Sequence, residues 1–291
     1  MLATFLQFFM SGLTVGAIYA LVALGFTLVY NASNVINFAQ GEFVMLGGML
    51  AVVFTQAGLP MPLTMLLAIG LPAVVGVLME KLTIEPVKNA DIITLIIITL
   101  GASLIIRGLV QVTLGKGSHT IPAFSGDEPV HLLGATLPPQ SLWVLGGTAV
   151  VVLVLWYFFT RTLSGKAMLA TSYNRIASQL VGINTSWVLF MSFALSSAIG
   201  ALGGILVTPI TMTSFDVGIM LGLKGFVAAV LGGMGSGLGA VIGGLLVGLI
   251  ESTASGYLSS AYKDAIPFVL ILFILFFMPR GLLGGKATDR V

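Results

Sequence analysis

The stretch RTLSGKAMLATSYNRIASQLVGINTS, from Arg161 to Ser186, has apolar segments on both sides that are long enough to cross a bilayer. It carries three positive charges, on Arg161, Lys166 and Arg175, and no carboxylate. Short basic loops of inserted membrane proteins stay on the cytoplasmic side. The stretch therefore predicts a cytoplasmic loop that fixes the orientation of the segments on either side.

The second half of this loop has the apolar pattern of a short helix. Ile176, Leu180 and Ile183 are spaced at i, i+4 and i+7, which places them on one helix face. Gly182 and Asn184 supply a stop signal. Two interpretations stay open from these residues alone: a helix that docks a soluble partner, or a solvated connector lying on the lipid surface.

The composition places the whole chain in a membrane. Of its residues 57% are hydrophobic and only 8% are charged, whereas soluble domains carry about 25% charged residues. The apolar runs are continuous rather than alternating, which favours helices over a β-barrel. We expect an all-α integral membrane protein, a single transmembrane domain over residues 1–291, with about 8–10 transmembrane segments and a broken or re-entrant helix among them.

The placement of charges predicts the topology. No basic residue occurs before Lys81, so residues 2–30 are expected to be a retained span that starts outside rather than a cleaved signal peptide. Residues 115–140 form the longest expected external loop. Nine crossings then place eight of the twelve basic residues in the cytoplasm: Lys81, Lys88, Arg161, Lys166, Arg175, Arg280, Lys286 and Arg290. Residues 217–232 either span or re-enter the membrane, and the number of crossings depends on them.

A row of polar residues interrupts the apolar pattern near the amino end. Asn31, Asn34, Asn37 and Gln40 recur every three residues, and Glu42 follows. The spacing aligns the amides along one side of a helix or tight turn near the membrane edge, where irregular backbone must face protein or water. Either these residues line a translocation pathway in a broken helix, or they only hold helices together by hydrogen bonds.

Glycines dominate a second segment, GGMGSGLGAVIGGLLVG at residues 232–248. The spacing of Gly235, Gly239 and Gly243, and of Gly244 and Gly248, is typical of closely packed membrane helices. No GxxxxGK[ST] pattern occurs anywhere, so we expect no nucleotide site on this chain.

Two further positions carry polar groups that bear on chemistry. Arg107 lies inside an apolar segment, and we expect it to reach the outer interface, since a central position would cost about 2.5–3.5 kcal/mol and require a partner. His119 and His131 fall in the external loop without a third ligand, so no metal site is predicted. The chain has no Cys, which excludes thiol chemistry.

Two long runs carry a family resemblance. GLTVGAIYALVALGFTLVYNASNVINFAQGEFVMLGG (Gly12–Gly48) and GLKGFVAAVLGGMGSGLGAVIGGLLVGLIES (Gly222–Ser252) resemble the two ends of LivH-type permeases, the inner-membrane subunits of bacterial ABC importers for branched-chain amino acids. The resemblance implies a permease that moves substrate by alternating access. The basic residues Arg280, Lys286 and Arg290 predict a cytoplasmic carboxyl end. Since no nucleotide motif occurs, we expect no cofactor on this chain and ATP bound by partner subunits.

The same resemblance implies partners and a coupling site. The partners are a LivM-type permease, two ABC ATPase subunits, a periplasmic substrate-binding protein and membrane lipid, with no nucleic acid. ABC importer permeases carry an EAA-type motif, in which Ala177 and Gly182 match here while Ile176 and Ser178 replace an acidic residue and an alanine. ATPase coupling is therefore expected at Lys166, Arg175, Ile176, Ala177, Ser178 and Gly182.

Two alternatives to a branched-chain amino acid importer remain open from the sequence. Related permeases carry urea or short amides. An ion-coupled secondary amino acid transporter would use the intramembrane charges Glu42, Arg107 or Lys224. Catalysis within the membrane is not expected, because both His lie in the external loop.

Overall fold

The computed structural model describes residues 2–87, 90–126, 128–132 and 134–284. Apart from one two-stranded sheet, the regular structure of these residues is helical. This all-helical, polytopic architecture is the one that the composition predicts.

Among the described residues, six helices are long and apolar enough to cross a membrane. They are α1 (Leu2–Ser33), α3 (Met61–Met79), α4 (Ile92–Leu114), α5 (Pro139–Arg161), α8 (Thr185–Thr211) and α10 (Gly237–Tyr257). Three shorter apolar helices accompany them: α2 (Gln40–Gln56), α9 (Val217–Gly232) and α11 (Ile266–Phe277). Single helical turns follow as η1 (Glu80–Ile84) and η2 (Glu85–Val87) after α3, and as η3 (Ser260–Tyr262) before α11.

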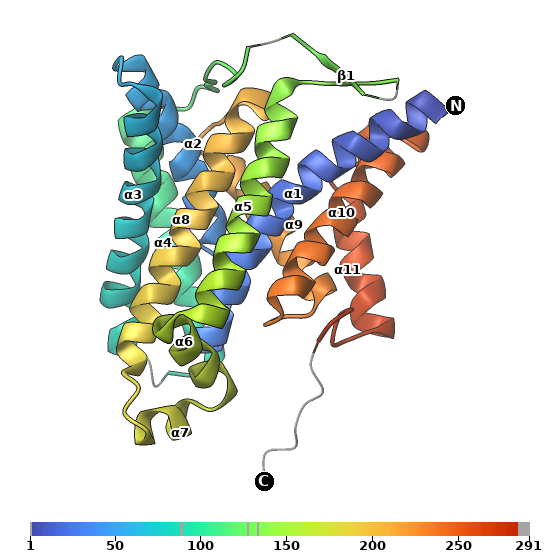
Figure 1. Cartoon of the computed structure of the whole chain (residues 1–291). Helices are drawn as coiled ribbons and strands as arrows, with labels where there is room; N and C mark the ends of the chain where they lie inside the picture. Colours follow the sequence, from blue (N-terminus) through green and yellow to red (C-terminus); the bar gives the residue numbers. More distant parts are fainter. Residues whose placement is uncertain (1, 88–89, 127, 133, 285–291) are drawn as a thin grey trace.

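The two ends of the bundle differ (Figure 1). One end, called here the loop end, carries α6 (Leu163–Tyr173) and α7 (Arg175–Leu180). The other, called here the hairpin end, carries the strands β1 (Val130–Leu132) and β2 (Ala135–Leu137), which pair antiparallel. The apolar helices run alternately between these ends, as the predicted topology requires. The loop of residues 161–186 contains two helices, where the sequence pattern predicted only the second.

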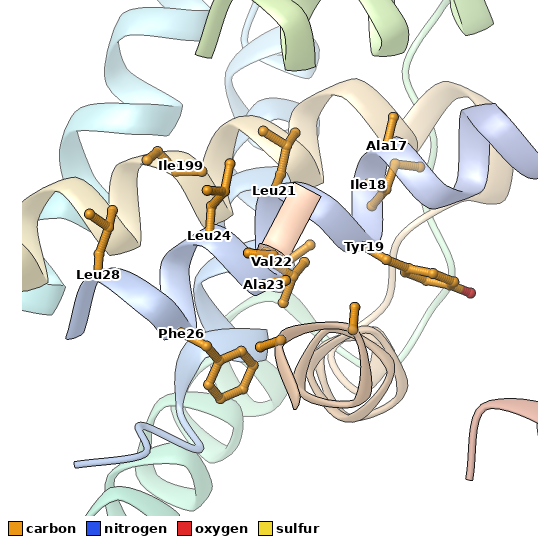
Figure 2. Close-up of a cluster of buried hydrophobic side chains, with 14 of the residues drawn as sticks. Ala17, Ile18, Tyr19, Leu21, Val22, Ala23, Leu24, Phe26, Leu28 and Ile199 are labelled. Atoms are coloured by element: carbon orange, nitrogen blue, oxygen red, sulfur yellow. The ribbon is translucent and has the colours of Figure 1, made fainter. Parts of the chain in front are cut away.

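Helix α1 is the centre of the bundle. In its most apolar window 89% of the residues are buried, against 22–28% for α3, α4 and α5. Figure 2 shows Tyr19, Leu21 and Phe26 pointing away from the α1 axis in different directions, and all three are almost fully buried. This burial arises because α1 is enclosed by α5, α8, α9 and α10.

Glycines let α10 approach two neighbours at backbone distance. Gly244 and Gly248 face α1, where a Cβ would overlap Ala20 and Gly16. Gly239 and Gly243 face α9, against the carbonyl oxygens of Gly232 and Ala228.

The remaining glycine of that sequence pattern is placed differently. Gly235 has a φ of +93° and lies in the turn between α9 and α10 rather than on a helix face. Its neighbour there is the Asn31 side chain.

The last described residues return to the end of α9. The backbone N–H groups of Leu282 and Leu283 donate to the carbonyl oxygens of Leu231 and Gly232, at 2.8 and 2.9 Å. These carbonyls belong to the last turn of α9 and have no intrahelical partner. The carboxyl-terminal segment therefore caps α9 at the loop end.

The glycine packing generates a prediction. Changing Gly248→Ala should lower the unfolding midpoint of the purified protein, because its Cβ would overlap the Gly16 backbone, and overpacking costs about 1–3 kcal/mol. Gly101→Ala in α4 is the matched control, since a Cβ there meets nothing within 4 Å. Equal midpoints for the two variants would contradict the packing role.

Candidate translocation site and coupling surface

The helical backbone is interrupted between α1 and α2, inside the bundle. Asn34 adopts a φ of +57°, and the segment that follows is mostly buried, with Asn37 fully so. The Asn37 side-chain oxygen accepts from the Ala39 N–H at 3.0 Å, and the Phe38 N–H donates to the Thr99 hydroxyl at 3.2 Å. Side chains thus supply hydrogen bonds that a continuous helix would have made internally.

Gln40 fixes the start of α2 against α8. Its side-chain nitrogen donates to the Ser196 carbonyl at 3.1 Å, and its oxygen accepts from the Ser196 hydroxyl at 2.5 Å. Gly25 on α1 provides the space that the Gln40 amide occupies. Ser196, which the sequence pattern did not single out, lies near the middle of α8, so α2 begins halfway along the longer helices.

The polar row does not share one helix face. Asn31 lies in the last turn of α1 and donates to the Gly235 carbonyl at 2.9 Å. Asn34 and Asn37 are in the interruption, and Gln40 is the first residue of α2. A three-residue spacing cannot keep side chains on one face once the helix between them ends.

Glu42 of α2 and Arg107 of α4 form an ion pair. Arg107 Nε lies 3.4 Å from Glu42 Oε1, and Ser103 donates to the same oxygen at 2.8 Å. The sequence predicted that Arg107 would reach the outer interface, and this prediction is wrong. Arg107 turns toward a carboxylate that is 2% exposed, because a buried acid compensates the cost of an intramembrane guanidinium.

This ion pair lines a cavity of about 260 Å³ between α1, α2, α4 and α9. The first turns of α2 and α9 meet beside it, since Gly41 of α2 lies against the backbone of Gly218 and Gly222 of α9. The cavity is apolar over most of its wall and charged at Glu42 and Arg107.

A second buried charge cluster lies on the other side of α9. Lys224 donates to Glu251 of α10 and to Asp264 before α11, both at 2.7 Å. Tyr19 of α1 donates to the second Glu251 oxygen at 2.9 Å. The cluster ties four segments together, and the hydrogen bond from Lys224 holds the pKa of Asp264 below its ordinary value.

The loop end presents an apolar surface on α7. Ile176, Leu180 and Val181 are 72%, 83% and 76% exposed. Asn174 caps the start of α7 by accepting from the Ala177 N–H at 2.9 Å, and Gly182 ends it with a φ of +89°. We define Ile176, Leu180 and Val181 as the α7 surface.

The other predicted coupling residues lie on α6 and α7. Lys166 is exposed on α6, Arg175 opens α7, and Ser178 is buried against the bundle. Of the basic residues expected on one side, those that the structure describes lie at the loop end: Lys81, Arg161, Lys166, Arg175 and Arg280. Lys88, Lys286 and Arg290 lie outside the described residues.

A polytopic helical bundle with polar residues at an interior helix break is the architecture of a membrane permease. The family model described as "Branched-chain amino acid transport system / permease component" matches residues 8–275. The chain is 32% identical to the "High-affinity branched-chain amino acid transport system permease protein LivH" of Escherichia coli K12, over 99% of this chain and 98% of that protein.

Other relatives agree. The permease protein BraD of Pseudomonas aeruginosa, also described as high-affinity branched-chain amino acid transport, is 30% identical over 99% of this chain and 98% of that one. The solved structure of PsaBC from Streptococcus pneumoniae in complex with Fab covers 96% of this chain and 97% of its own at a TM-score of 0.52. At 15% identity it shows a shared fold.

The chain therefore belongs to the family of permease components of branched-chain amino acid transport systems. It is a LivH-type, multi-pass membrane permease and a transport subunit rather than an enzyme.

The charge cluster around Lys224 generates a prediction about stability and pH. Lys224→Met leaves the Glu251 carboxylate buried beside Tyr19 alone, and losing one partner of a buried pair costs about 3–5 kcal/mol. Asp264→Asn should cost less than about 1 kcal/mol, because the Asp264 side chain is 49% exposed. Thermal unfolding of the purified protein in detergent measures both.

The pH dependence has a definite sign. A carboxylate whose pKa is lowered by folding stabilises the protein above its ordinary pKa, and the contribution is lost as pH falls through the lowered value. The difference in unfolding midpoint between wild type and Asp264→Asn should thus be present at neutral pH and close as the pH falls below the ordinary Asp pKa of about 3.9. A gap that widens on acidification would contradict the assigned contact.

Proposed function

We propose that this protein is the transmembrane subunit of an ATP-driven ABC importer for branched-chain amino acids in the bacterial inner membrane. Its partners are a second permease of the LivM type, two ATPase subunits, which bind the ATP, and a periplasmic substrate-binding protein. The observation that carries the proposal is the α7 surface, a short helix with exposed apolar side chains among basic residues at one end of the bundle. The names of the relatives supply the substrate class.

The ATPase would bind the α7 surface and move it. Large apolar side chains that are exposed together mark contact sites for another protein or for a membrane, and we propose the protein. Ser178 packs toward the bundle, and Gln179 donates to the Thr185 hydroxyl of α8 at 2.9 Å. Displacement of α7 is thereby transmitted to α8. The missing acidic residue at Ile176 implies an apolar rather than an ionic contact with the ATPase at that position.

The movement of α8 would reach the interior through Ser196. Because Ser196 holds Gln40 at the first turn of α2, a shift of α8 changes the position of the helix break. We propose that Asn31, Asn34, Asn37, Gln40 and Glu42 line or gate the passage, with Gln40 serving mainly as the connection to α8. Alternating access then follows from movement of α2 and α8 relative to α9.

The coupling proposal predicts the effect of Gly182→Val. A β-branched residue at a φ of +89° strains the backbone by about 1–3 kcal/mol and displaces the end of α7. Reconstituted complex should hydrolyse ATP while leucine uptake falls at least about tenfold. Gly58→Val is the matched control, since Gly58 has a φ of +78°, also meets nothing within 4 Å, and lies in the turn after α2. Normal coupled uptake by Gly182→Val would contradict the role of α7.

Orientation is tested by labelling, because the natural chain has no Cys. We expect Ile176→Cys to react with a membrane-impermeant maleimide only after cells are opened, and Ala57→Cys, exposed at the opposite end, to react in cells whose outer membrane alone is permeable. Labelling of Ile176→Cys from the periplasm would overturn the cytoplasmic assignment of the loop end. It would also exclude the proposed ATPase contact.

A further inference from the structure

The Glu42–Arg107 ion pair is not internally complete. Among the described residues, Glu42 Oε2 and Arg107 Nε make no hydrogen bond, although both atoms are buried. In the part of the chain that the structure describes, Ser103 bridges the two, since it donates to Glu42 Oε1 and accepts from Arg107 Nη2 at 3.4 Å. Buried charged groups are normally hydrogen-bonded. The pair therefore has capacity for a ligand with both a donor and an acceptor.

The space beside the pair is open to such a ligand. Both side chains line the cavity of about 260 Å³, just below the size of about 300 Å³ at which small-molecule sites begin. Glu42 Oε2 is itself buried, and a Cβ at Gly218 would lie 3.1 Å from it, so a glycine at this position leaves the most room beside that oxygen. Beyond the charged end, the wall is apolar and includes Phe26, Leu100 and Leu223.

The local field favours a ligand anion at one point and a ligand cation at another. The first turns of α2 and α9 both reach the cavity, through Glu42 and Gly218. Helix N-termini carry partial positive charge and, with the Arg107 guanidinium, favour a carboxylate. Glu42 Oε2 has the opposite sign and favours an ammonium group. The two protein charges are only 3.4 Å apart.

An α-amino acid matches this arrangement in charge and in shape. Its ammonium and carboxylate groups are attached to one carbon, so they can face two adjacent protein charges of opposite sign. A branched aliphatic side chain would then lie against the apolar wall. We propose that this cavity binds the amino acid zwitterion in transit: Glu42 Oε2 accepts from the ammonium group, Arg107 donates to the carboxylate, and the wall of α1, α4 and α9 receives the side chain.

This assignment rests on the proposed function for the class of solute and adds to it a site on the permease itself. It is tested without the ATPase or the binding protein, so that a failure of ATPase coupling leaves the result unaffected. The experiment uses the full chain in membrane vesicles. It measures how much a ligand slows the reaction of a single introduced cysteine with N-ethylmaleimide. Ile219→Cys is the reporter, because Ile219 is 38% exposed and lines the cavity.

L-Leucine should slow the reaction of the Ile219→Cys thiol with N-ethylmaleimide in a saturable way. The deaminated analogue 4-methylpentanoate and the decarboxylated analogue 3-methylbutylamine should each protect at concentrations about ten- to a hundredfold higher, because each lacks one charge-assisted contact. Leu238→Cys is the control. It lines a separate cavity between α1, α5 and α10 whose described lining residues are all uncharged, and leucine should not protect it.

Variants of the pair complete the test. Glu42→Gln and Arg107→Gln, each in the reporter background, should raise the leucine concentration for half-protection by about ten- to a hundredfold. The double variant leaves no unpaired buried charge, so it keeps the fold if either single variant fails to assemble, and it should abolish protection.

Leucine protection that survives in the double variant would overturn the proposal, and so would protection by either analogue at the same concentration as leucine. Protection by urea or acetamide without protection by leucine would overturn it as well. If wild-type vesicles show no leucine protection while the complete complex imports leucine, the cavity assignment fails and the proposed function stands.

Discussion

A break in a helix that lies inside an apolar bundle must have its main-chain hydrogen bonds supplied by neighbouring groups. Between α1 and α2 the Asn37 and Thr99 side chains meet this constraint, and the Ser196–Gln40 contact fixes the first turn of α2. The break also sets where α2 begins, and hence where Glu42 lies relative to α4. Both the ion pair with Arg107 and the cavity beside it follow from that position.

The second condition for this structure is that helices approach each other closely, and this depends on glycines, which have no side chain. Gly25 gives the Gln40 amide its space, Gly41 and Gly218 bring α2 and α9 together, and Gly244 brings α10 onto α1. Lipid offers little hydrophobic drive for helices to associate, so packing of small residues and interhelical hydrogen bonds carry that role. In this protein, packing of glycines and interhelical hydrogen bonds occur together around the start of α2.

The amino-acid sequence determines the helical class, the basic loop end and the bounds of α9, because hydropathy and the position of charge act over long segments. It also contains the glycine positions of α10, though Gly235 falls in a turn that spacing alone cannot distinguish from a helix. Arg107 was placed wrongly because its partner, Glu42, is distant in sequence, and pairing depends on tertiary packing. Ser196 and the four-segment cluster at Lys224 were not recognised as sites for the same reason.

The cap on α9 has a consequence for the wall of the cavity beside Glu42. Leu282 and Leu283 satisfy the carbonyls of Leu231 and Gly232, so the last turn of α9 depends on a segment that follows α11 in the sequence. The helix that forms one wall of the cavity is thus fixed at its loop end by residues that are distant from it along the chain.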